Sequence, residues 1–67
     1  MSTRYEIRIN CALSETIRSA FSDLRAVELS PDSTLLTGDI RDQSELHGLL
    51  ARIADLGIAI TEIRAQP

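Results

Sequence analysis

Three groups of side chains in this 67-residue sequence are of types that do chemistry: one histidine, one cysteine and a short run of carboxylates. His47 could serve as a general base, because an imidazole changes its charge near neutral pH. Spacing alone pairs it with no serine or cysteine nucleophile. A partly exposed helix position, or a contact residue for a partner, is the favoured interpretation. We therefore predict no catalytic residue and no enzyme.

The cysteine and the carboxylates favour structural roles. Cys11 is the only cysteine, which excludes an internal disulfide and a cysteine-cluster zinc site, and a lone thiol of this kind is more often a small buried apolar residue than a nucleophile. Asp39, Asp42 and Glu45 are spaced by three, so three carboxylates could in principle hold a divalent cation. The run lacks the alternating oxygen ligands and the turn glycine of a calcium loop. We predict no metal and no cofactor.

Composition narrows the classes of partner. Ten acidic residues against seven arginines give a net charge of −3, the arginines are scattered, and the only aromatic residues are Tyr5 and Phe21. A basic patch and a stacking platform are both missing, so nucleic-acid binding is not expected. The first residues lack the pattern of a secretion signal, and no apolar run approaches the roughly 20 residues that span a bilayer. We expect a cytoplasmic protein without a membrane partner.

Apolar periodicity predicts the first half of the fold. Residues 5–10 alternate apolar and polar side chains, as a half-buried strand does. From Leu13 the apolar spacing becomes four, four and three through Leu24, which predicts a helix with Ser14 as its N-cap. Residues 25–29 and 34–40 alternate again around the turn residues 30–33, which predicts a hairpin. Gly38, between Leu36 and Ile40, would let a helix approach the sheet closely.

The segment DQSELHGLLARIADLG, residues 42–57, predicts the second helix. Asp42 and Glu45 have the spacing of a capping box, the apolar residues follow one stripe, and Gly57 is suited to close the helix in the left-handed conformation. Gly48 costs this helix about 1 kcal/mol relative to alanine, and close packing within the chain, or against a second subunit, would explain it. Residues 58–64 form the last strand. Ile60 and Ile63 fall on opposite faces of an ideal strand, which predicts either a bulge or some exposed apolar surface.

These elements predict an α+β fold: one ferredoxin-like βαββαβ two-layer domain over residues 1–67, with a four-stranded antiparallel sheet and both helices on one face. The first and third strands would be central, and the second and fourth would lie at the edges. The face away from the helices would be mostly charged and able to stay in contact with water, which argues against a dimer built by stacking two sheets. We expect that face to carry Glu6, Arg8, Leu35, Thr37, Glu62 and Arg64.

The C-terminal half resembles a group of short, uncharacterised bacterial proteins of actinobacterial type. The matching residues are Asp42-Gln43, Leu46-His47-Gly48-Leu49-Leu50 and Asp55-Leu56-Gly57, and the opening residues 5–8 are similar too. The resemblance covers about half of the chain and implies a bacterial cytosolic setting and the short βαββαβ layout. It implies no activity.

Two hypotheses of function follow. The first is a non-enzymatic protein–protein interaction or oligomerisation module, which binds another copy of itself or another protein through an edge strand or an exposed helix surface. Its partner-contact candidates are His47, Gly48, Val27 and Ile60. The second, which rests on fold alone, is a small-molecule-sensing regulatory domain that binds its ligand at a dimer interface.

Overall fold

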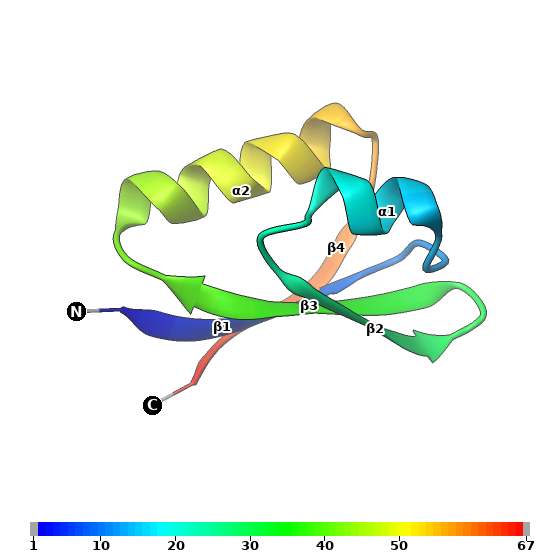
Figure 1. The fold of residues 1–67 in the computed structure, drawn as a ribbon, viewed down its shortest axis with the longest axis horizontal. Helices are drawn as coiled ribbons and strands as arrows, with labels where there is room; N and C mark the ends of the chain where they lie inside the picture. The colour runs from blue at the N-terminus through cyan, green and yellow to red at the C-terminus, as the bar shows by residue number, and fades with distance from the viewer. Residues whose placement is uncertain (1, 67) are drawn as a thin grey trace.

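Two helices cover one face of a four-stranded antiparallel sheet (Figure 1). The computed structural model describes residues 2–66. Across the sheet the strands lie in the order β2-β3-β1-β4, so the first and third strands are central and the other two form the edges, as predicted. The elements along the chain are β1 (Thr3–Ile9), α1 (Glu15–Ala20), β2 (Arg25–Ser30), β3 (Ser33–Ile40), α2 (Gln43–Asp55) and β4 (Ile60–Gln66).

The core is a single apolar layer between the sheet and the helices. In the central pair, Ile7 of β1 lies opposite Leu36 of β3, and both are buried. Alternation along each strand places every second side chain in this layer, and the helices contribute residues at helical spacing. Each fully buried Ile, Leu or Phe contributes about 1.5–3 kcal/mol to stability. The buried apolar residues are Ile7, Ile9, Ile17, Phe21, Leu36, Ile40, Leu49 and Ile53.

Helix α2 begins and ends as its sequence predicts. The Asp42 carboxylate accepts a hydrogen bond from the Glu45 backbone N–H at 2.8 Å, as an N-cap does. The Glu45 carboxylate accepts from the backbone N–H of Arg41, one residue before the cap, and so differs from a reciprocal capping box. At the other end Gly57 has φ +72°, the left-handed conformation that favours glycine. The N-cap at Asp42 and the left-handed Gly57 are confirmed, whereas the reciprocal capping box is wrong, because Glu45 accepts from Arg41 and not from Asp42.

Helix α1 is shorter than the apolar stripe predicts. Ser14 is its N-cap, as expected, with its hydroxyl accepting from the Ile17 N–H. The prediction that the helix continues through Leu24 is wrong, because the helix ends at Ala20. Phe21 leaves the helical conformation, and the Leu24 N–H donates to the Phe21 carbonyl in a turn. Side chains on this turn still reach the core, which explains why the apolar spacing extends beyond the helix.

Gly38 makes room for that turn. A Cβ at this position would overlap Leu24 Cδ2, so the missing side chain admits Leu24 against β3. The prediction of a close approach at Gly38 is therefore confirmed. The predicted neighbour, a helix, is wrong, because the segment that approaches Gly38 is the turn that contains Leu24.

Strand β4 contains the bulge that its sequence suggested. The register with β1 shifts between Arg8 and Ile9, so Thr61 is an extra residue between Glu62 and Ile60. The Thr61 hydroxyl donates to the Arg8 carbonyl at 3.2 Å. As a result Ile60 lies opposite Ile9 and Ile63 lies opposite Ile7, so both isoleucines are on the helix side of the sheet.

The Gly38–Leu24 contact can be tested by a double-mutant cycle. We expect Gly38→Ala to lower the free energy of unfolding by no more than about 1 kcal/mol, because the added methyl group displaces only the terminal Cδ2 methyl of the flexible Leu24 side chain. In a Leu24→Ala background the same change should cost little, because its neighbour is gone. Urea unfolding of the four proteins measures both values. Equal costs in the two backgrounds would show that the contact is not what requires glycine.

Candidate functional site

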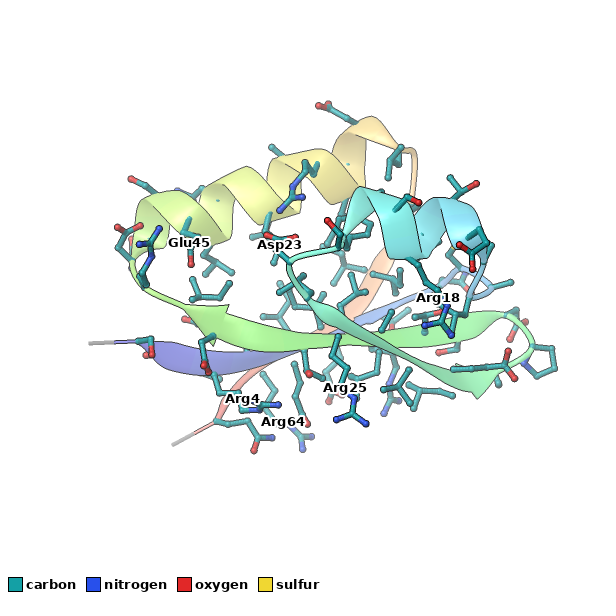
Figure 2. All side chains as sticks on the ribbon, in the orientation of Figure 1. Arg4, Arg18, Asp23, Arg25, Glu45 and Arg64 are labelled. Atoms are coloured by element: carbon teal, nitrogen blue, oxygen red, sulfur yellow. The ribbon has the colours of Figure 1, made fainter. Side chains whose placement is uncertain are left out.

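The open face of the sheet is charged. Arg4, Arg25 and Arg64 extend away from the helices (Figure 2), and strand pairing places further charged residues beside them. The face carries four arginines, at 4, 8, 25 and 64, and three carboxylates, at 6, 39 and 62. The two signs are interspersed, so the prediction of a mostly charged face is confirmed. Thr37 belongs to this face but is only 8% exposed, because longer side chains on the neighbouring strands surround it.

Most of these charges pair across strands. Arg4 lies 3.8 Å from Asp39 on the neighbouring strand. Glu62 lies 3.9 Å from Arg8 on the neighbouring strand and 3.2 Å from Arg64 on its own strand. Every one of these side chains is roughly half exposed or more. Such pairs contribute little, about 0–1 kcal/mol each. They can therefore exchange partners at low cost.

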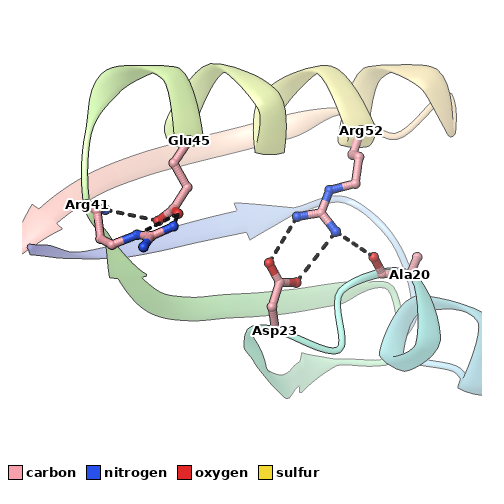
Figure 3. Close-up of polar contacts among 5 residues, drawn as sticks. All are labelled: Ala20, Asp23, Arg41, Glu45 and Arg52. Carbon is pink, nitrogen blue, oxygen red and sulfur yellow. Dashed lines mark hydrogen bonds and ion pairs between the residues drawn. The ribbon is translucent and has the colours of Figure 1, made fainter.

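A second polar cluster joins the two helices. Arg52 of α2 donates to both carboxylate oxygens of Asp23, at 3.5 and 3.1 Å, and to the Ala20 carbonyl at 3.0 Å (Figure 3). Its guanidinium also lies 5.5 Å from the centre of the Phe21 ring, within range of a cation–π interaction. The hydrogen bond from Arg52 lowers the pKa of Asp23. One arginine thus caps the end of α1 and fixes the turn that follows it.

A shallow cleft of about 400 Å³ runs between this cluster and the start of α2. Its far end holds Arg41, whose guanidinium donates twice to the Glu45 carboxylate (Figure 3). Leu24, Ile40 and Leu49 supply apolar lining. Both arginines of the cleft are paired with carboxylates of the same cleft. The third carboxylate of the lining, Asp39, pairs with Arg4 outside the cleft, so the lining is acidic overall.

The chemically capable residues are not brought together. His47 is exposed on α2, and Cys11 is half-buried in the loop after β1, where its carbonyl accepts from the Thr34 hydroxyl at 2.7 Å. Neither residue lines any of three clefts found over residues 2–66. Nor does that part of the chain contain a group of three or more potential metal ligands. The acidic run is used locally, for Asp42 in capping and for Asp39 and Glu45 in ion pairs.

Gly48 does not mark a close contact within the chain. A Cβ built there would have no atom within 4 Å outside its own helix backbone and immediate neighbours. The expectation that Gly48 lets α2 pack closely inside the subunit is therefore wrong. Gly48 destabilises the helix relative to alanine. No close contact within the single chain compensates for this, because residue 48 is on the solvent side of α2.

The two strand candidates lie at opposite edges. Val27 is on β2 and is 37% exposed, and Ile60 is on β4 and is half-buried. The four partner-contact candidates therefore cannot share one surface: Val27 is separated from Ile60 by the width of the sheet.

A residue that the sequence analysis did not single out as a contact is more exposed than either. Ile63 points to the helix side of β4, yet 44% of it is exposed. Leu46, Leu50 and Ile60 are partly buried and pack against the core. Leu46 lines the same small cleft as Tyr5, the β1 residue opposite Ala65 of β4. We call Leu46, Leu50, Ile60, Ile63 and Ala65 the β4–α2 edge. In the sequence, the spacing of Ile60 and Ile63 was the feature that could have indicated this surface.

Removing the Asp23 carboxylate should reduce the loss of stability between neutral and acidic pH. Arg52 lowers the pKa of Asp23 in the folded state. The pair therefore stabilises the fold at pH values above the pKa of Asp23 in the unfolded chain, which is near 4. This stabilisation is lost as the pH falls through the lower pKa of the folded state. Asp23 is 62% exposed, so the contribution is at most about 1 kcal/mol. Urea unfolding at about pH 7 and pH 2.5 should show a smaller change for Asp23→Asn than for wild type.

Asp55→Asn is the matched control, because Asp55 has no ion pair within residues 2–66. An Asp23→Asn protein with the full wild-type loss of stability in acid would contradict the role assigned to the pair.

Comparison with known proteins places the chain in a family. A search of curated proteins and a search of solved structures gave no significant match. No helix within residues 2–66 is long and apolar enough to cross a membrane. A family model matches residues 4–64, and it describes a domain of unknown function, DUF8691. Because this match spans nearly the whole sequence, the chain belongs to the DUF8691 family.

Proposed function

We propose that this chain is a non-enzymatic protein–protein interaction module whose binding surface is the β4–α2 edge. The observation that carries the proposal is Ile63: a large apolar side chain on the helix side of an edge strand that is 44% exposed. Edge strands offer unpaired backbone N–H and C=O groups to another chain. At this edge those groups lie next to apolar surface, so a partner gains both hydrogen bonds and burial.

The layout of the clefts favours a binding role over an enzymatic one. In the cleft beside Arg41 and Arg52 both guanidinium groups are paired with carboxylates, and the histidine and the cysteine lie outside it. A general base needs its target within hydrogen-bond reach. His47 instead lies one residue after Leu46 on exposed helix surface, where it can contact a partner at the rim of the β4–α2 edge.

We further propose that the fold is of the ferredoxin-like class, in a bacterial and cytoplasmic protein. The order of elements along the chain, the central position of β1 and β3, and the placement of both helices on one face support the fold assignment. The bacterial cytosolic setting rests on the resemblance of the segment 42–57 to short bacterial proteins.

Affinity capture with edge variants tests the proposed surface. Immobilised wild type should retain a specific partner from a lysate of the source organism, and Ile63→Lys should lose it, because a charge replaces the apolar contact. Val27→Lys is the matched control, since it adds the same charge at the opposite edge. Equal capture by all three proteins, or a loss with Val27→Lys only, would contradict the β4–α2 edge as the binding surface.

The second candidate is a ligand-sensing domain. The cleft beside Arg41 and Arg52 favours it, because two guanidinium groups, nearby carboxylates and an apolar lining suit a small ligand with charges of both signs, such as an amino acid. The proposal adds that the ligand also contacts a second subunit.

A thermal-shift screen of the amino acids tests this candidate. A ligand at one hundred times its dissociation constant should stabilise the protein by about 2.7 kcal/mol, and Arg41→Gln should reduce the shift. If none of the amino acids raises the melting temperature, the ligand-sensing hypothesis is contradicted.

A further inference from the structure

We propose that the partner of the β4–α2 edge is a second copy of this chain, joined through antiparallel pairing of β4 with its twofold axis at Ile63. This inference rests on the proposed function and adds the partner and the register. The two four-stranded sheets would join into one sheet of eight strands, with all four helices on the same side.

The charges of β4 select the register. In a symmetric antiparallel pair, residues opposite each other have position numbers with a constant sum and point to the same face. With Ile63 on the axis, Glu62 of each chain lies opposite Arg64 of the other, and both point to the open face. An axis at Glu62 or at Arg64 would instead place like charges opposite each other, which is unfavourable. The order Glu-Ile-Arg is thus complementary to itself in this register.

The apolar side of the strand fits the same register. Ile63 would meet its own copy on the helix side, where the Cβ atoms of directly opposed residues lie about 4.5–5.5 Å apart. Helix α2 lies on the β4 side of the helical layer, and α1 lies on the β2 side (Figure 1). The half-buried Leu46 and Leu50 of the two α2 helices would therefore flank the isoleucine pair. The exposed part of Ile63 would be covered from both chains.

The opposite edge lacks this complementarity. The charges of β2 are Arg25 and Glu28, which are three positions apart and point to opposite faces. Their position numbers add to an odd sum, so no symmetric antiparallel register can place them opposite each other. With Val27 on the axis, Arg25 would face Leu29 and Glu28 would face Ala26. This leaves β4 as the edge whose charges pair with a copy of itself.

The charged side chains of β4 are free to make these pairs. In the single chain, Arg64 donates to Glu62 of the same strand at 3.2 Å, and the two side chains are 61% and 45% exposed. An exposed pair of this kind contributes little and is readily exchanged. Across the axis, each carboxylate would gain the guanidinium of the other copy without leaving the surface.

Charge reversal tests the register. We expect wild type to dimerise in sedimentation velocity across a concentration series at low salt. Glu62→Arg and Arg64→Glu should each weaken self-association about tenfold or more, because both symmetric pairs become like-charged. An equimolar mixture of the two variants should recover dimers, since each contact then joins opposite charges. Arg25→Glu, a charge reversal on the same face at the other edge, should associate as wild type does.

The outcomes separate this inference from the proposed function. A wild type that stays monomeric up to millimolar concentration overturns the dimer, and so does a mixture of the two variants that fails to recover association. Self-association lost with Arg25→Glu but kept with the β4 variants overturns it as well. Urea unfolding of each variant shows that a loss of dimer is not a loss of fold. If wild type is monomeric but Ile63→Lys still loses its captured partner, the β4–α2 edge binds another protein, and the proposed function stands without the dimer.

Discussion

One apolar layer holds this fold together, and it can be built on only one side of the sheet. Residues 2–66 form two helices, of 6 and 13 residues, and both lie over the same face. A small domain buries a limited share of its surface and has few apolar residues to spare. The other face of the sheet must therefore stay in contact with water. Its interspersed arginines and carboxylates satisfy that requirement.

The two sides of the helical layer are built from different elements. Helix α1 ends after six residues, and a turn continues in its place. Arg52 fixes the turn from the neighbouring helix by binding Asp23 and the Ala20 carbonyl, and the turn places Leu24 on Gly38. The β2 side of the layer is thereby closed by a loop, whereas on the β4 side no segment within residues 2–66 covers Ile63.

The bulge at Thr61 connects the fold to its proposed role. Without the extra residue, Ile60 and Ile63 would point to opposite faces, and one of them would lie among the charges of the open face. With it, both isoleucines are on the helix side, and Glu62 and Arg64 are together on the other. In β4, the isoleucines thus all point to one face of the sheet and the charged side chains all point to the other. This separation is what allows a second strand to match it on both faces.

The sequence by itself determined the elements, their order and the caps of α2, because these depend on local periodicity and on hydrogen bonds between residues three or four apart, such as Asp42 with Glu45. It also indicated the mostly charged open face and the bulge in the last strand, since both follow from the period of two along a strand. Only the tertiary structure decided where α1 ends, that Leu24 occupies the space above Gly38, that Gly48 faces open solvent and that Ile63 is left uncovered. Each of these depends on contacts between segments distant in sequence, such as Arg52 with Ala20, and no local pattern of side chains encodes them.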